Sequence, residues 1–234
     1  MIITIDGPAS AGKGTLASTL AGIYHLAYFD TGMVYRAVGL EMILSGYETD
    51  NAEAAENFAK NLTFPRMIEL SKHADFRSLK GGQAATVVSC IPSVRAALLK
   101  MQQDFSLNPV FADGTPANGA VYDGRDTGTV VCPQADIKFF ITASPEVRAM
   151  RRFKEMAAKG MDVTYEDVLK DVNHRDEMAT NRKIAPLKPA ADAHLLDTSD
   201  LSIEQVVEQA CKIIESHKAV SYTHLRAHET KANL

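Results

Sequence analysis

Short apolar runs alternate with helical patterns through the first part of the chain. The β-branched run at residues 2–5 stops at Asp6-Gly7-Pro8, which predicts a buried strand that breaks into a turn. Small and apolar residues at helical spacing follow over residues 13–24, and the same order of strand, turn and helix recurs at residues 26–44. The chain therefore begins with two strand–helix units.

The rest of the chain continues the alternation after a long helical stretch. Residues 50–110 have helical patterns with breaks at Phe64-Pro65 and Gly81-Gly82, and residues 105–119 are rich in Asn, Pro, Gly and Asp, which predicts an exposed loop. Further strands are predicted at residues 121–122, 137–141 and 193–196, and further helices at 145–159, 165–181 and 203–216, the last with a cap formed by Ser202 and Gln205. No internal repeat is present. Strands that alternate with helices predict an α/β fold with a parallel sheet.

Composition narrows the class of protein. A chain of 234 residues with 46% hydrophobic and 23% charged residues can bury a full core. The net charge of -4 argues against nucleic acid as a partner, and no apolar run approaches the ~20 residues of a membrane helix. The start of the chain lacks the pattern of a signal peptide, so we expect a cytoplasmic protein. Cys90, Cys132 and Cys211 are far apart, and this spacing indicates neither a zinc site nor a disulfide framework.

The turn after the first strand has the pattern of a phosphate-binding loop. Its residues are Gly7, Pro8, Ala9, Ser10, Ala11, Gly12, Lys13, Gly14 and Thr15, and we predict that they bind ATP. Glycines let backbone N–H groups converge on one phosphate, and the following helix directs its N-terminal dipole at the same anion.

Two side chains of this loop have predicted roles of their own. Lys13 can reach the β- and γ-phosphates, and Thr15 is the candidate hydroxyl for Mg²⁺, because Gly14 stands where a Ser or Thr usually follows the lysine. The loop alone does not distinguish kinases from GTPases and other NTPases. The chain has no NKxD guanine signature, which weakens the GTPase interpretation.

Arginines follow the other predicted strands or lie in the helices near them. They are Arg36, Arg125, Arg151, Arg152, Arg175 and Arg182. Ligands of α/β proteins bind where strands end and helices begin, and arginine pairs bidentately with phosphate. The cluster favours a second phosphate-bearing substrate over a nucleotide-binding switch that only hydrolyses ATP slowly.

At these segments the chain resembles the bacterial cytidylate kinases, which are P-loop nucleoside-monophosphate kinases. The segments that carry the resemblance are GPASAGKGT, DTGMVYRAV, IPSVRAALL, DGRDTGTVV, TASPEVRAMRR, APLKPAADA and LSIEQVV. The resemblance implies a single domain over residues 1–218, with the three-layer P-loop NTPase fold and a five-stranded parallel sheet. It also implies a helical acceptor-binding insertion at about residues 50–110 and a lid at about residues 152–183.

The resemblance also implies an activity and a set of site residues. The activity is transfer of the γ-phosphate of ATP to CMP or dCMP with Mg²⁺, by a monomer that binds small nucleotides and neither nucleic acid nor membrane; UMP or AMP is the alternative acceptor. The implied catalytic residues are Lys13, Arg125, Arg151, Arg152 and Arg182. The implied CMP-binding residues are Thr31, Arg36, Thr86, Arg95, Arg125, Asp126, Arg175 and Arg182.

The chemistry of cytosine agrees with two of these roles. Arg95 can donate to the ring carbonyl and ring nitrogen of cytosine, and Asp126 can accept from its exocyclic amine. Uracil lacks that amine, so a buried carboxylate discriminates against it.

The chain departs from the family pattern at two places. Ala179 stands where the family usually has an Asp, three residues before Arg182, which predicts weaker contacts to the sugar. Residues 219–234, AVSYTHLRAHETKANL, read like a translated sequencing adapter, and we interpret them as a non-native, disordered tail.

Overall fold

The computed structural model describes the backbone of residues 1–232 and the side chains of residues 1–219. Its elements, in chain order, are β1 (Ile2–Asp6), α1 (Lys13–Tyr24), β2 (Ala27–Asp30), α2 (Gly32–Leu44), α3 (Ala52–Asn61), α4 (Phe64–Ser71), the 3₁₀ turn η1 (Ala74–Arg77), α5 (Leu79–Val88), α6 (Pro92–Leu107), β3 (Ala120–Gly124), the π-helical turn η2 (Thr127–Val131), β4 (Ile137–Thr142), α7 (Pro145–Ala158), α8 (Tyr165–Thr180), β5 (His194–Asp197) and α9 (Ile203–Ala232).

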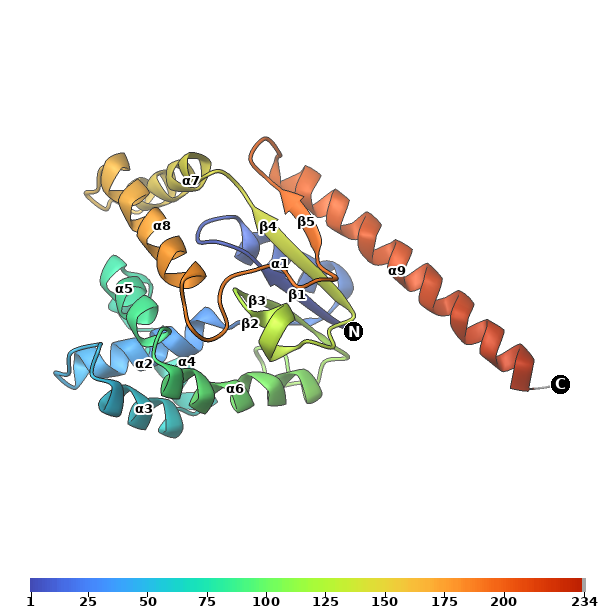
Figure 1. Cartoon of the computed structure of the whole chain (residues 1–234), viewed down its shortest axis with the longest axis horizontal. Helices are drawn as coiled ribbons and strands as arrows, with labels where there is room; N and C mark the ends of the chain where they lie inside the picture. Colours follow the sequence, from blue (N-terminus) through green and yellow to red (C-terminus); the bar gives the residue numbers. More distant parts are fainter. Residues whose placement is uncertain (233–234) are drawn as a thin grey trace.

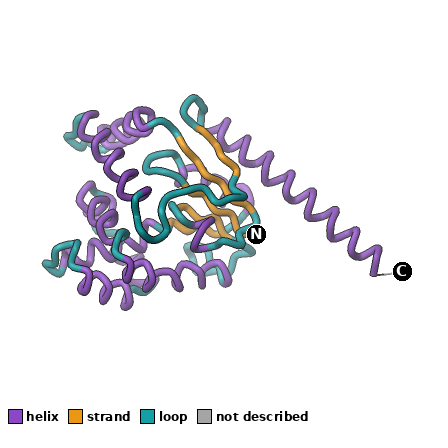
Figure 2. Tube along the Cα trace, viewed as in Figure 1, coloured by secondary structure: helices purple, strands orange, loops and turns teal. Residues whose placement is uncertain are grey.

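The five strands form one parallel sheet in the order β2-β3-β1-β4-β5. Because all strands are parallel, their carboxyl ends meet at one edge of the sheet, from which the loops shown in Figure 2 lead to the helices. Asp6 pairs with Gly124, and Asp30 pairs with Asp123, so the phosphate loop and the segments after β2 and β3 begin side by side. This register places the predicted ligand-binding segments at one edge.

The sheet is the middle of three layers (Figure 1). Ile3 and Ile5 of β1 pack with α1 and α9 on one face, and Tyr122 of β3 packs with α2 and α6 on the other. Val121 lies in the first of these cores, between Ala120 and Tyr122 of the second, because side chains alternate along a strand. The predicted α/β fold with a five-stranded parallel sheet is confirmed.

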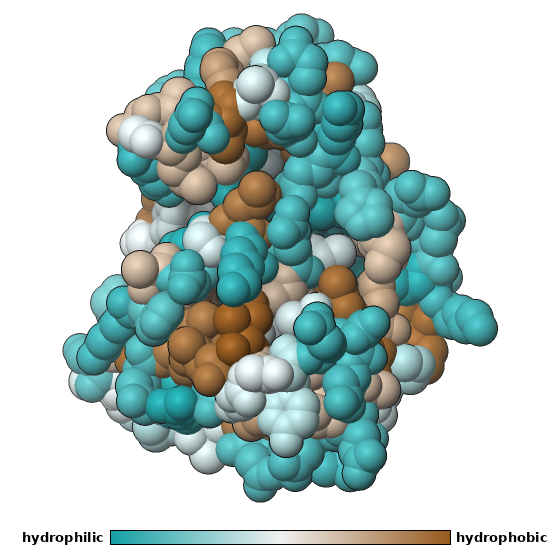
Figure 3. Space-filling view, turned by 90° about the vertical axis from the view of Figure 1, so that its left-hand side faces the viewer, coloured by the Kyte–Doolittle hydropathy of each residue, from teal (hydrophilic) through white to brown (hydrophobic). Residues whose placement is uncertain are grey.

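Two helical units extend from the carboxyl edge of the sheet. Helices α3 to α6 occupy residues 52–107, and α7 packs on α8 around a small apolar core that includes Ala149, Met156 and Val172. In the space-filling view of Figure 3, this second unit lies above the first, and the surface between them is hollowed.

Two boundaries differ from the prediction. Phe105 was expected to open an exposed loop, but it lies in α6 and is 8% exposed, because it stacks on Phe29 with ring centroids 4.6 Å apart. The helix expected to end at Ser216 continues to Ala232, where a disordered tail was expected. Residues 217–232 contain no proline or glycine that would end a helix. The non-native origin of these residues stays a prediction.

Within the described part of the chain, no single helix is long and apolar enough to cross a membrane. Helices α5 and α6 satisfy the length and composition requirements only as a pair, and they are bent by 99° relative to each other.

We expect the core contribution of α9 to end near Ile214. Its described core residues are Val206, Ala210 and Ile214, the last of which has no exposed surface. Ile214→Ala should lower the free energy of unfolding by about 2–5 kcal/mol, whereas a chain that ends after Lys218 should melt at the wild-type temperature. Differential scanning calorimetry of both variants checks this. A truncated chain that melts as low as Ile214→Ala would contradict it.

Candidate active site

The phosphate loop takes a backbone path that only particular residues allow. Gly7 has a φ of +151°, and a Cβ there would lie 2.0 Å from the carbonyl oxygen of Ile141. Gly12 has a φ of +96°, in the left-handed region that glycine adopts without strain. The loop therefore curls tightly between β1 and the N-terminus of α1, as the sequence predicts.

Lys13, the first residue of α1, lies at the centre of the site. Its side chain is buried, and its Nζ donates to the carbonyl oxygen of Pro8 over 2.8 Å. Burial, together with the positive charges of Arg125 and Arg175, lowers the pKa of Lys13 to about 8 against the opposing effect of Asp123. A neighbouring anion would therefore stabilise the charged form of Lys13.

Asp123, at the end of β3, explains why Gly14 follows the lysine. A Cβ on Gly14 would lie 3.2 Å from Oδ2 of Asp123, so a larger residue would crowd that carboxylate. Burial raises the pKa of Asp123 to about 6, and the charge of Lys13 opposes this rise. The sequence analysis did not assign Asp123 to the site. Its position at a strand end was the available signal.

A first cavity opens at the carboxyl edge between α5, α8 and the phosphate loop. Its lining includes these residues predicted to bind nucleotide: Ala9, Ser10, Lys13, Thr31, Arg36, Thr86, Arg125, Asp126, Arg175 and Arg182. Ala179 also lines it and is 5% exposed. Residues from segments up to 173 positions apart in the sequence thus converge on one space.

The predicted arginines of this cavity are half-buried, and three of them have a buried nitrogen atom without a hydrogen-bond partner among the described residues. Within the described residues, the Nε atoms of Arg125 and Arg175 and the Nη2 atom of Arg182 are buried and have no hydrogen-bond partner. Burial lowers the pKa of all three, as do neighbouring arginines. Buried cations normally have hydrogen-bonded partners. The cavity is therefore suited to an anion with several oxygen atoms, such as a phosphate monoester.

Arg95 and Asp126 were both predicted to contact the base of the acceptor. In the structure the two side chains form a buried ion pair with each other, and Arg95 also donates to the carbonyl oxygen of Ser89 over 3.2 Å. Asp126 lines the first cavity, whereas Arg95 is not among its lining residues. Arg95 thus lies behind the carboxylate and fixes its position.

Asp6 fixes the segment that carries Arg125 and Asp126. Its carboxylate accepts hydrogen bonds from the N–H and Oγ1 of Thr127 and from the N–H of Gly128, each over 2.8 Å. The π-helical turn η2 begins at Thr127, and the sequence analysis did not predict it. A buried carboxylate with three donors holds this turn against the end of β1.

A second cavity lies on the other side of Lys13. Its lining includes residues 10–15 of the phosphate loop, the arginines Arg151 and Arg152, and the apolar side chains of Leu201, Val206 and Val207. Arg151 donates to Oγ1 and the carbonyl oxygen of Thr198 over 3.0 and 2.5 Å, and Arg152 pairs with Glu155 over 2.9 Å. Two of the predicted ATP-binding residues, Gly7 and Pro8, line neither cavity. They form the start of the phosphate loop.

Both cavities share one wall. The shared residues are Ser10, Lys13, Arg36, Arg77, Asp123 and Arg175. A group could therefore pass from one cavity to the other at this wall. Together the two cavities form a site for two anionic ligands with a charged junction.

Comparison with known proteins assigns the family. The family described as cytidylate kinase matches residues 3–216. The chain belongs to the cytidylate kinase family. It is 48% identical over 219 residues to the cytidylate kinase of Rhodospirillum rubrum, which covers 94% of this chain and 99% of that protein. It is likewise 48% identical over 217 residues to the cytidylate kinase of Paramagnetospirillum magneticum, covering 93% and 99% of the two chains.

A solved structure shares the fold. The crystal structure of an uncharacterized protein from Eubacterium ventriosum has a TM-score of 0.50 and 13% identity to this chain, and covers 92% of this chain and 99% of that one. At this identity the likeness concerns the fold alone.

Arg77 lines both cavities but was not assigned to the site from the sequence. It lies at the end of η1 in the helical insertion. Within the described residues, its guanidinium has no hydrogen bond or ion pair of its own. Nothing in the local pattern distinguishes it from a solvated arginine, because its position depends on how the insertion folds back over the sheet.

Few protein oxygens are available for the Mg²⁺ ion that the sequence predicts. Thr15 is exposed and lines the second cavity, and Asp123 lines both cavities. No group of three or more His, Cys, Asp or Glu side chains among the described residues could hold a metal ion. Mg²⁺ commonly binds through one or two protein oxygens plus substrate phosphates, and these residues fit that arrangement.

We expect the uncompensated arginines to destabilise the ligand-free protein. Arg125→Met removes one buried charge, so it should raise the free energy of unfolding by about 1 kcal/mol in buffer without phosphate or nucleotide. Arg66→Met is the matched control. Arg66 pairs with Glu41 and Glu69 over 2.9 and 2.8 Å, so its loss should leave stability unchanged or lower it. Urea unfolding of both variants measures the difference. A less stable Arg125→Met protein would contradict the argument.

Proposed function

We propose that this protein transfers the γ-phosphate of ATP to CMP or dCMP and releases ADP and CDP or dCDP. The observation that carries the proposal is the group of buried arginine nitrogens without partners beside the phosphate-loop lysine. Membership of the cytidylate kinase family supports the same acceptor. A monomeric state and a cytoplasmic location stay predictions from the sequence.

The first cavity would bind the acceptor. Arg36, Arg125, Arg175 and Arg182 would hold its phosphate, with Thr31 at the end of β2 beside them. Arg36 is oriented by a 2.9 Å hydrogen bond from its Nη1 to the carbonyl oxygen of Phe76. Four guanidinium groups around one phosphate would give both charge and direction to the acceptor oxygen.

Asp126 would read the base. Its carboxylate lines the first cavity, as does Thr86, and its ion pair with Arg95 fixes its position. A carboxylate accepts a hydrogen bond from the exocyclic amine of cytosine, and uracil has no such amine. With UMP the carboxylate would lack this hydrogen bond, at a cost of about 1–3 kcal/mol.

The second cavity would bind ATP, with the base against Leu201, Val206 and Val207. Lys13, Arg151 and Arg152 would lie along the phosphates, and Thr15 and Asp123 would offer oxygens toward Mg²⁺. When bound, Mg²⁺ neutralises charge on the phosphates. Phosphoryl transfer needs in-line positioning and positive charge around the equatorial oxygens, and Lys13, Arg36, Arg77 and Arg175 on the shared wall would supply both.

Two alternatives from the sequence analysis remain to be compared. A kinase for UMP or AMP would use the same phosphate-binding arginines and would differ at Asp126. A nucleotide-binding switch would need no second anion site. The first cavity, with arginine nitrogen atoms that have no partner among the described residues, therefore favours a kinase.

The direct test is ADP release in a coupled assay with CMP, dCMP, UMP, AMP and GMP. We expect CMP or dCMP to react fastest and UMP more slowly. Lys13→Ala should abolish transfer with the far-UV circular dichroism unchanged, because Lys13 contributes charge and little packing. Turnover with AMP or GMP at or above the rate with CMP would contradict the cytidylate assignment.

Ala179 gives a test of the sugar site. Its methyl group lines the first cavity, where the family pattern has a carboxylate acceptor for ribose hydroxyls. We therefore expect raised KM values for both CMP and dCMP. Ala179→Asp should lower both by about 2- to 10-fold, which corresponds to one hydrogen bond of about 0.5–1.5 kcal/mol. Steady-state kinetics with both nucleotides measures this. If neither KM changes, position 179 does not face the sugar.

A further inference from the structure

Asp176 connects the lid helix to the phosphate loop. It lies in α8, and its Oδ1 accepts a hydrogen bond from the N–H of Ala9 over 3.2 Å. Its Oδ2 forms an ion pair with Nη1 of Arg148 over 2.5 Å. The same Nη1 donates to the carbonyl oxygen of Ala9 over 3.0 Å. Both polar backbone groups of one phosphate-loop residue are therefore held by a single ion pair.

Arg148 gives this ion pair a rigid base. Its side chain is 4% exposed, and its Nε donates to the carbonyl oxygen of Ala143 over 2.8 Å. The backbone N–H of Arg148 donates to the carbonyl oxygen of Ser144, the N-cap residue of α7. The buried guanidinium needs a counterion, and Asp176 supplies it from α8 only while the lid lies on the loop.

The position of α8 decides where two site arginines lie. Arg175 precedes Asp176 in the chain and lines both cavities, and Arg182 follows the end of the helix. Apart from the contacts of Asp176, α8 accepts hydrogen bonds from two described site residues, from Nε of Arg182 to the carbonyl oxygen of Ala179 over 3.3 Å and, weakly, from Sγ of Cys90 to the carbonyl oxygen of Met178 over 3.9 Å. The contacts of Asp176 are thus the strongest polar restraint on the distance between Arg175 and the phosphate loop.

We propose that Asp176 is a positioning residue that fastens the lid helix to Ala9 of the phosphate loop and thereby places Arg175 at the phosphates. The proposal rests on the function proposed above. An alternative role for Asp176 is to replace, in sugar binding, the carboxylate that position 179 lacks, but Asp176 does not line the first cavity. Its two oxygens contact Ala9 and Arg148 instead.

A consequence is coupling between the two ligands. Phosphates of ATP order the loop that contains Ala9, and the acceptor phosphate binds Arg175 and Arg182. Each ligand then favours the same closed arrangement of α8, so each should raise the affinity for the other. Without the carboxylate the loop and the lid lose this connection.

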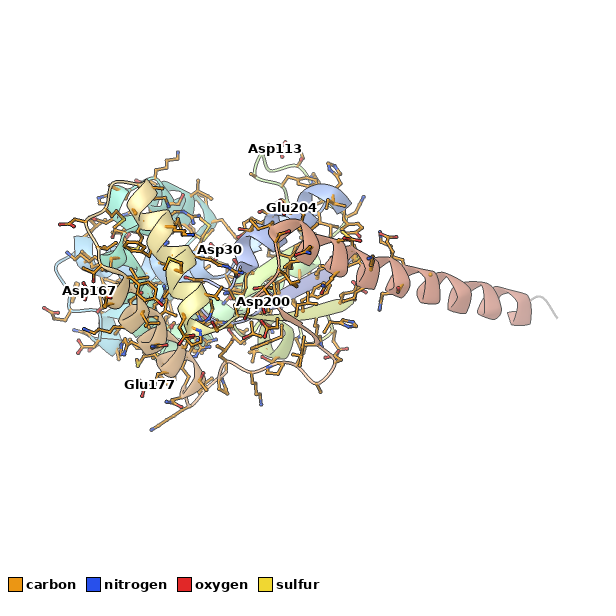
Figure 4. All side chains as sticks on the ribbon, turned by 90° about the horizontal axis from the view of Figure 1, so that it is seen from above. Asp30, Asp113, Asp167, Glu177, Asp200 and Glu204 are labelled. Atoms are coloured by element: carbon orange, nitrogen blue, oxygen red, sulfur yellow. The ribbon has the colours of Figure 1, made fainter. Side chains whose placement is uncertain are left out.

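The kinetic test compares two isosteric changes at adjacent positions. Asp176→Asn removes the charge that faces Arg148, whereas Glu177→Gln is the control because Glu177 is exposed and lies on the outer side of α8 (Figure 4). We expect Asp176→Asn to lower kcat/KM for CMP on the order of 10²-fold and to abolish the effect of ATP on CMP affinity. Glu177→Gln should retain wild-type values. An Asp176→Asn protein that melts earlier but keeps wild-type kcat and KM would show a purely structural role and overturn the proposal.

A second measurement does not depend on activity. Amide hydrogen exchange of the ligand-free wild type, followed by NMR, should show Ala9 protected at least 10-fold more than Ser10, whose N–H has no partner among the described residues. Asp176→Ala should remove the protection of Ala9. Equal protection of Ala9 and Ser10 in the wild type overturns the proposal, even if Asp176 variants do not fold. Wild-type protein that turns over no monophosphate refutes the proposed function instead, and the exchange result then still decides whether the contact exists.

Discussion

Repulsion among arginines in a buried cavity is the constraint on which the other features of this site depend. Arg125, Arg175 and Arg182 each have a buried nitrogen atom without a hydrogen-bond partner in the part of the chain that the structure describes, and the pKa of each is lowered by burial. Bringing such charges together costs free energy in the ligand-free protein. The arrangement persists because the three residues are carried by elements that are stable for other reasons. An incoming phosphate then recovers the free energy that their burial costs.

Most of the acidic residues of the site stabilise the segments that contain these arginines. Asp6 binds the turn after Arg125, Asp126 pairs with Arg95, and Asp176 bridges α8 to Ala9. Asp123 lies nearest Lys13, and its raised pKa shows how little solvation it keeps. Direct neutralisation of the arginines by these carboxylates would remove the reason to bind phosphate. Asp171 offsets the charge of Arg175 only in part, through an ion pair over 3.8 Å, so the cavity keeps an excess of positive charge for its substrate.

The sequence predicts what depends on local pattern. The strands, the phosphate loop and the helices α1, α2, α7 and α8 follow from periodicity and turn residues, and the structure places them within one or two positions of the prediction. Contacts between distant segments were not predictable in this way. The bond from Thr127 to Asp6 spans 121 positions, and the bond from Ala9 to Asp176 spans 167. Arg77 was missed for the same reason. Phe105 was assigned to a loop because its aromatic partners Phe29, Phe64 and Tyr122 lie in β2, α4 and β3.

The central claim is that the first cavity is built for the phosphate of its ligand more than for the nucleoside. Isothermal titration calorimetry of CMP and of cytidine against the ligand-free protein tests it most directly. The arginine cluster predicts that CMP binds at least 10²-fold more tightly than cytidine, with an affinity that falls as salt is added. Cytidine that binds within about threefold of CMP would contradict the account.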